Sequence, residues 1–234
     1  MKSVPSPETP IPDMLTALPP STHHPELEAF LARARHRLAV EAPAGLHLDG
    51  VPDHGDHRFS PGLLAELPAA PSKPAAVLIA LIDRPDGPTV LLTHRSSALR
   101  NHSGQIAFPG GRIDPEDGSA LAAAIREAEE EVGLSANLIS PIGYLDLYLT
   151  GSGYRIAPVV ALADPGMVLH LNPAEVDSVF ECPLTFLMDP ANHIAESREW
   201  RGAMRQYYAI PWQDHYIWGV TAGIIHTLYE RIYG

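Results

Sequence analysis

The chain has 234 residues, 45% of them hydrophobic, which is enough for one sizeable domain and an extension. Its formal net charge of −12 argues against a protein that binds nucleic-acid phosphates, so local basic residues and a metal ion would have to receive an anionic substrate. The single cysteine, Cys182, excludes an internal disulfide and fits a reducing, cytoplasmic setting. No apolar run approaches the ~20 residues that span a membrane, and the N-terminus lacks a hydrophobic segment of secretory type, so we expect no membrane association.

Residues 1–72 are interpreted as an extension that precedes the main domain. Prolines are dense in residues 1–24, which removes backbone donors and predicts a mobile or extended arm. An apolar face predicts a helix from Pro25 to Val40, with Pro25 in its first turn. Residues 41–74 are again rich in Pro and Gly and predict a polar loop, although a transition metal is an alternative because this segment contains His47, His54, His57, Asp49, Asp53 and Asp56.

The composition changes at Lys73-Pro74, and we place the main domain at residues 73–234. Ala75–Ile82 is a continuous apolar run rich in branched residues, which predicts a buried strand. A turn at Asp86-Gly87 and a returning strand, Thr89–His94, are expected to follow.

A Gly/Pro-rich loop comes next. The short strand Gln105–Ala107 is expected to deliver the loop Phe108-Pro109-Gly110-Gly111. Gly110 and Gly111 would let the backbone come close to a metal ion or to phosphates, and the proline would stiffen that approach. An ordinary tight turn is the alternative.

The segment after this loop predicts an Ala-rich helix that ends near Leu134 and carries three glutamates on one face. At about 100° per residue, Glu127, Glu130 and Glu131 share an arc roughly 100° wide beside an apolar stripe. Arg126 is the one basic residue among them, so the carboxylates would repel one another in the absence of a cation. Oxygen-only ligands favour Mg²⁺ or Mn²⁺ over zinc, and a surface helix without metal is the alternative.

Strands and helices continue to alternate up to the end of the chain. The hydrophobic patterns predict strands and two helices. The expected strands are Leu138–Leu149, Tyr154–Leu162, Ser178–Cys182, His193–Arg198, Arg205–Ile210 and His215–Trp218, with a turn at 211–214, and the expected helices are Pro183–Leu187 and Trp218–Tyr233. This alternation suits an α/β fold, with helices on both faces of a mixed β-sheet.

The loop and the Ala-rich helix together resemble the Nudix box, the motif of hydrolases that cleave nucleoside diphosphates linked to another group. The resemblance is carried by Gly111, Arg126, Glu127, Ala128, Glu130, Glu131, Gly133 and Leu134. The spacing from Gly111 to Arg126 is one residue longer than in the common box, and the early acid is Asp117 or Glu116. The resemblance implies the Nudix fold, an α/β/α sandwich around a mixed sheet, over about residues 75–232.

A second motif lies directly upstream. Residues 91–111 fit the pattern LLTxR[SA]xxxRxxxGxxxFPGG at every fixed position. With the longer box, this pattern resembles the coenzyme A pyrophosphatase branch of the Nudix family. It implies hydrolysis, dependent on Mg²⁺ or Mn²⁺, of the diphosphate bond of coenzyme A or its acyl or oxidised forms to 3′,5′-ADP and 4′-phosphopantetheine species. The alternatives are another diphosphate, such as ADP-ribose or a dinucleoside polyphosphate, and a non-catalytic nucleotide-sensing module. A homodimer is a possible assembly.

The resemblance also implies roles for individual acids and for one arginine. Glu127, Glu130 and Glu131 would hold the metal. Glu131 or Glu175 would accept the proton of the attacking water, although Glu175 is equally well explained as an ordinary acid of a turn. Arg126 would hold a glutamate in place, by pairing with Glu130 or with a carboxylate across the loop.

Substrate contacts are expected from residues around the loop. Arg95, Arg100 and His102 would lie near the nucleotide end of the substrate, where the planar guanidinium suits phosphate. Either arginine could instead be a surface residue or a partner of the acidic helix. Tyr154 would stack on the base or on the pantetheine arm, or pack as an ordinary strand aromatic. The backbone of Gly110-Gly111 would complete this set.

Overall fold

The computed structural model describes residues 23–46, 50–67, 72–99, 103–200 and 202–234. The expectations for the arm at 1–22, for His47 and Asp49, and for Arg100 and His102 fall outside these residues. In the described part of the chain, no helix is long and apolar enough to cross a membrane.

A mixed sheet forms the centre of the fold, and nine of its strands lie in the described residues. Its central strand, β2 (Lys73–Ile82), runs parallel to β8 (Tyr154–Ala163) and antiparallel to β3 (Thr89–Arg95) and β5 (Gly110–Arg112). The remaining strands are β1 (His54–Gly55), β4 (Ile106–Ala107), β6 (Ile139–Tyr144), β7 (Tyr148–Leu149) and β9 (Val176–Pro183). The order is β1-β7-β8-β2-β3-β4, with β5 on β2, β6 on β8 and β9 on β3.

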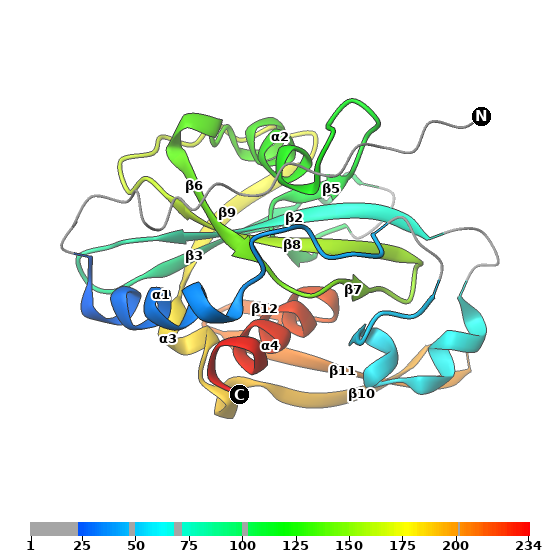
Figure 1. Ribbon diagram of the computed structural model, residues 1–234. Coiled ribbons are helices and arrows are strands. Elements are labelled where there is room, and N and C mark those ends of the chain that lie inside the picture. The colour runs from blue at the N-terminus through cyan, green and yellow to red at the C-terminus, as the bar shows by residue number, and fades with distance from the viewer. Residues whose placement is uncertain (1–22, 47–49, 68–71, 100–102, 201) are drawn as a thin grey trace.

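Helices cover both faces of this sheet (Figure 1), with α2 (Ala120–Val132) on one face and α1 (Pro25–Arg37) and α4 (Val220–Tyr233) on the other. The alternation of side chains along β2 explains the two cores. Ile79 and Leu81 belong to the core under α1 and α4, and Leu78 and Ala80 to the core under α2. The predicted α/β/α sandwich around a mixed sheet is confirmed.

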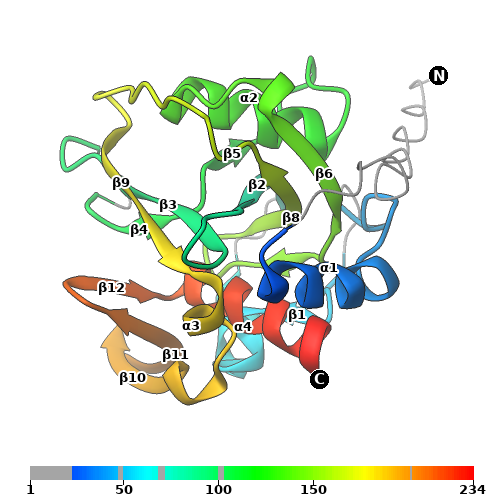
Figure 2. The same cartoon turned by 90° about the vertical axis from the view of Figure 1, so that its left-hand side faces the viewer.

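A second, antiparallel sheet lies beside α4 (Figure 2) and consists of β10 (Ile194–Trp200), β11 (Ala203–Trp212) and β12 (His215–Trp218). The turn that joins β11 to β12 is shorter than expected, because Pro211 and Trp212 pair with Tyr216 and His215 and therefore extend β11. The short helices between the strands are α3 (Leu184–Leu187), η3 (Ala136–Leu138) and η4 (Pro190–Asn192).

The N-terminal helix is part of the main core. Leu27 and Phe30 of α1 are fully buried beneath the sheet and beside α4. The helix ends at Arg37, three residues before the expected end, because Ala39 forms a β-bridge with Tyr144. The predicted strand 138–149 divides at the same place, since β6 ends at Tyr144 and β7 begins only at Tyr148.

Part of the segment expected to be a polar loop has regular structure. β1 pairs with β7 and is followed by two 3-10 helices, η1 (Asp56–Arg58) and η2 (Pro61–Glu66). Asp56 accepts hydrogen bonds from the Tyr148 hydroxyl and from the backbone N–H of Gly151, both at 2.8 Å. These contacts join the segment to β7 and to the turn that follows it, which hydrophobic periodicity could not predict.

Candidate active site

Helix α2 provides the rigid element of the site. Ser119 caps its N-terminus, where the Ser119 hydroxyl accepts a hydrogen bond from the Ala122 N–H at 3.0 Å. Gly133 caps its C-terminus in the left-handed conformation, with φ of 71°. Ala124 and Ala128 are fully buried against the sheet. Small side chains at this contact bring the helix close to β2 and β5, so longer side chains beside them reach the glycine loop.

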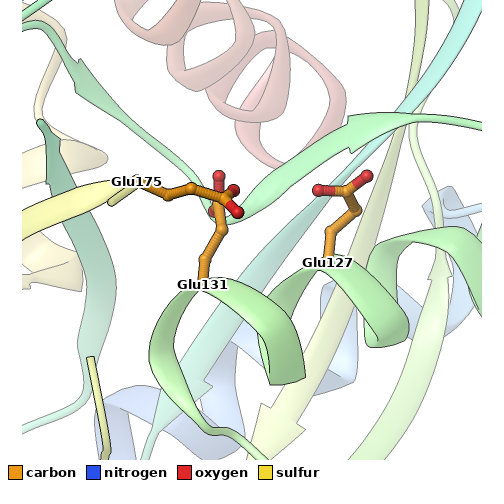
Figure 3. A group of neighbouring side chains, drawn as sticks. All are labelled: Glu127, Glu131 and Glu175. Carbon is orange, nitrogen blue, oxygen red and sulfur yellow. The ribbon is translucent and has the colours of Figure 1, made fainter. Parts of the chain in front are cut away.

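Three carboxylates converge beside this helix, and we call Glu127, Glu131 and Glu175 the carboxylate cluster (Figure 3). Each has a carboxylate oxygen within 4.8 Å of those of the other two. Glu127 and Glu131 lie one helical turn apart on α2, and Glu175 reaches them from the segment that leads into β9. In the described residues this is the one such group with metal-ligand geometry, so His54, His57, Asp53 and Asp56 do not form a second.

Glu131 lies deepest in the cluster, with only 1% of its surface exposed. Its carboxylate accepts a hydrogen bond from the Gly110 N–H at 3.1 Å and lies 3.3 Å from Nη1 of Arg95. Burial raises the pKa of Glu131 to about 7, because desolvation outweighs the lowering effects of these two neighbours. Burial also raises the pKa of Glu127, although Arg126 opposes the shift.

The two glycines of the loop make room for this arrangement. A Cβ on Gly111 would lie 2.5 Å from the carboxyl carbon of Glu127, so the carboxylate occupies the space of the missing side chain. A Cβ on Gly110 would lie 2.4 Å from the backbone oxygen of Ala76 on β2. Gly111 therefore makes room for a carboxylate of the cluster, whereas Gly110 makes room for the backbone of the sheet.

Arg126 pairs with acids of the preceding loop and of its own helix. Its guanidinium donates to Asp117 at 2.7 and 3.0 Å and to Glu130 at 2.9 Å, and it lies 3.1 Å from Glu127. The hydrogen bonds from Arg126 lower the pKa of Asp117. Arg126 therefore makes both of the contacts that were expected as alternatives, one with Glu130 and one with a carboxylate across the loop, Asp117. Glu130 is half exposed, points to Arg126 and is not a member of the carboxylate cluster.

Of the remaining expected site residues, Arg95 reaches the cluster, Tyr154 packs elsewhere against the core, and Arg100 and His102 lie outside the described residues. Tyr154 is half-buried at the start of β8, where its ring packs against the core and lies 5.3 Å from Nζ of Lys73. Arg95 does contact the acidic helix, through Glu131. A residue that sequence reasoning does not single out is Asn172, whose amide donates to Glu175 at 3.2 Å. The one available signal is its position in an Asn-Pro turn immediately before Glu175.

Comparison with known proteins gives consistent sequence matches. A family model described as NUDIX domain matches residues 72–204, a range that contains the whole carboxylate cluster. A protein of Photorhabdus laumondii named "Uncharacterized Nudix hydrolase NudL" is 44% identical over 158 residues, which cover 68% of this chain and 84% of the relative. A protein of the same name from Yersinia pestis (strain Pestoides F) is 38% identical over 203 residues, which cover 87% and 95%.

Solved structures resemble the chain less closely. A MutT/nudix family protein from Enterococcus faecalis has a TM-score of 0.45 at 17% identity and covers 70% of this chain and 63% of its own. An Ap4A hydrolase from C. elegans has a TM-score of 0.42 at 20% identity, and covers 47% of this chain and 80% of its own. The assignment of the chain to a family therefore depends on the sequence matches and not on these structures.

Proposed function

The chain belongs to the NUDIX domain family and is a Nudix hydrolase, and from that premise we propose that its substrate is coenzyme A or an acyl or oxidised form of it. Water would cleave the diphosphate bond, giving 3′,5′-ADP and 4′-phosphopantetheine or its derivative. The observation that carries this choice is the motif of residues 91–111, which fits the coenzyme A pyrophosphatase pattern at every fixed position. The observation that carries the chemistry is the carboxylate cluster.

The carboxylate cluster suits a divalent metal ion. Its donors are all oxygens, they come from two separate elements, and Glu131 is a buried acid, so Mg²⁺ or Mn²⁺ fits better than a softer ion. An ion bound there would neutralise the diphosphate and make a bound water more acidic. Glu130 completes the proposed ligand set, and it would have to release Arg126 to join the cluster.

Protein groups in the site can perform the remaining steps. Glu131 is proposed as the base that takes the proton of the attacking water, because its carboxylate lies deepest in the carboxylate cluster. Glu175 is the second candidate base. The water oxygen then bonds to phosphorus while the bond to the bridging oxygen breaks, and that oxygen leaves with the other phosphate. Arg126 is proposed to keep Glu127 in place.

Substrate binding is proposed for residues around the loop. Arg95 already lies at the cluster and would turn its guanidinium towards the phosphates. Arg100 and His102 are proposed for the nucleotide end, and Tyr154 for the base or the pantetheine arm. The backbone of Gly110-Gly111 would lie against the diphosphate. A cytoplasmic location and a homodimer stay predictions, and light scattering would test the second.

Mass spectrometry of the products tests the proposal. The protein is incubated with coenzyme A, acetyl-coenzyme A, ADP-ribose and Ap4A in separate reactions with Mg²⁺ or Mn²⁺, and with chelator as a control. We expect 3′,5′-ADP from the first two substrates, in the presence of metal only. If ADP-ribose or Ap4A is cleaved and coenzyme A is left intact, the cleaved compound takes the place of coenzyme A as the proposed substrate. Absence of turnover on all four compounds would contradict the proposal.

A further inference from the structure

The segment that leads to Glu175 is attached to the end of helix α2. The last carbonyls of a helix have no donor within the helix. Here the N–H of His170 donates to the carbonyl of Val132, and the N–H of Asn172 donates to the carbonyl of Glu131, both at 2.9 Å. The segment packs directly on the helix end, because a Cβ on Gly133 would lie 2.8 Å from the backbone nitrogen of His170.

Asn172 joins this attachment to the turn that carries Glu175. Its side-chain oxygen accepts from the Ala174 N–H at 3.1 Å, and its backbone carbonyl accepts from the N–H groups of Glu175 and Val176 at 3.0 and 2.9 Å. Its side-chain NH₂ donates to a carboxylate oxygen of Glu175 at 3.2 Å. One residue therefore contacts the helix turn of Glu131, the turn of Glu175 and the carboxylate of Glu175 itself.

The Glu175 carboxylate needs such a restraint. It is only half-buried, and it has an oxygen within 4.8 Å of oxygens of two other carboxylates, which repel its negative charge. Repulsion would turn a free glutamate side chain towards solvent. Glu127 and Glu131 each have a guanidinium neighbour, whereas the amide of Asn172 is neutral. A neutral donor holds the carboxylate without competing with a cation for its charge.

We propose that Asn172 is a positioning residue, which aims the carboxylate of Glu175 at the divalent ion by the hydrogen bond from its amide. The inference rests on the proposed function, because it assumes that the carboxylate cluster holds Mg²⁺ or Mn²⁺. In this role Asn172 acts through Glu175 and is not itself a ligand of the ion. The relation is that of a hydrogen-bonded support for a ligand, whose loss weakens metal binding by about 10- to 100-fold.

The test measures Mn²⁺ affinity in the absence of substrate, by electron paramagnetic resonance of the free ion. For Asn172→Ala we expect an affinity about 10- to 100-fold weaker than that of the unaltered protein. Asn172→Ser should weaken it to a similar degree with less loss of thermal stability, because a serine hydroxyl can still accept from the Ala174 N–H but is too short to reach Glu175. Asn192→Ala is the matched control, since its amide donates to the Phe186 carbonyl at 2.9 Å in another part of the fold.

A double-mutant cycle separates positioning from general damage. In a Glu175→Ala background, Asn172→Ala should change the Mn²⁺ affinity less than about twofold, because its target is gone. An equal loss in both backgrounds would mean that Asn172 acts on the end of α2, and would overturn the inference. Unchanged affinity of Asn172→Ala and Asn172→Ser would do the same. If Glu131→Gln also binds Mn²⁺ normally, the metal site and the proposed function fall as well.

Discussion

Two polar clusters lie on opposite sides of the central sheet, and they are built on different principles. On the α2 side lies the carboxylate cluster. On the α4 side lies a group that we call the histidine cluster, which consists of His193, His226, Glu230 and Arg58. Both combine helix residues with residues from distant segments, and both contain side chains that are largely buried.

The histidine cluster provides partners within the fold for His193 and for its one acid, Glu230. Nε2 of His193 donates to the carbonyl of Leu187 at 2.7 Å, which leaves Nδ1 as the acceptor for His226 at 2.9 Å. Glu230 lies 3.5 Å from Nε2 of His226 and accepts from Arg58 at 2.9 Å. Its one acid is therefore paired with the guanidinium of Arg58, while burial lowers the pKa of the neighbouring His226.

The carboxylate cluster is not balanced in this way. Arg126 alone faces Glu127, Glu130 and Asp117, and Arg95 faces Glu131. Glu175 has a neutral amide as its hydrogen-bond partner. A cluster that completes its own contacts stabilises the fold, whereas one with surplus negative charge is suited to receive a cation. The comparison predicts that substitutions in the histidine cluster change stability and that substitutions in the carboxylate cluster change activity.

The strongest test of that comparison is Glu131→Gln. We expect kcat/KM to fall about 10²- to 10⁴-fold, because the amide can neither accept the proton nor bind the metal as a carboxylate does. The protein should stay folded, since the amide oxygen can still accept from Gly110. Steady-state kinetics measure kcat/KM, and a thermal melt shows whether the protein stays folded. Glu129→Gln, an exposed position on the same helix, is the control and should stay within about twofold.

Glu130→Gln asks whether the acid that the structure pairs with Arg126 still belongs to the metal site. If Glu130 releases Arg126 to become a ligand, the loss should reach about 10²-fold with the fold intact. The same kinetic assay, repeated over a range of Mg²⁺ concentrations, measures it. Near-normal turnover would remove Glu130 from the proposed ligand set and leave the carboxylate cluster as the whole site.

Gly111→Ala tests whether the space beside Glu127 matters. The new Cβ would lie 2.5 Å from the carboxylate and must displace it, so we expect kcat/KM to fall roughly 10- to 100-fold. Gly62→Ala is the matched control, because a Cβ there meets nothing within 4 Å. Equal activities of the two variants would show that the position of Glu127 is not critical.

His226→Ala tests the other side of the comparison. The variant loses the hydrogen bond to His193 and the contact with Glu230, and it leaves a cavity, so we expect about 2 kcal/mol less stability. Denaturant unfolding measures this loss. The kcat/KM of the folded variant should stay within about twofold, and a large loss of activity would end the distinction between the two clusters.

A change of pH tests the burial of Glu131 without any substitution. With its pKa raised from 4.5 to about 7, Glu131 of the metal-free folded protein keeps a proton that the unfolded chain has lost. The folded state binds more protons in this window, so stability should decrease as pH rises from about 4.5 to 7 and then level off. Mn²⁺ affinity should rise by up to about tenfold per pH unit at pH values well below 7 and should level off above 7. Melts and Mn²⁺ titrations of wild type and Glu131→Gln check both, and a flat wild-type profile would contradict the burial argument.

Much of the fold is predictable because its signals are local. The apolar run of β2 and the spacing of α2 predict those elements to within a few residues, and Ser119 and Gly133 mark the ends of the helix. Boundaries that depend on distant partners are the ones that differ. α1 stops early because Ala39 pairs with Tyr144, more than a hundred residues away. The structure at 54–66 likewise depends on contacts with β7 and the turn after it.

The sequence by itself determines that α2 carries several glutamates on one face, that glycines precede it, and that the pattern is that of a Nudix hydrolase. Helical periodicity and residue type are sufficient for the first two, because both are local properties, whereas the third depends on the resemblance of the motif to that of the family. Tertiary structure alone decides which carboxylates meet. It brings Glu175 to Glu131 and buries Glu131 deeply enough to raise its pKa. Burial and pairing depend on segments that are far apart in the chain, and a helical wheel does not contain them.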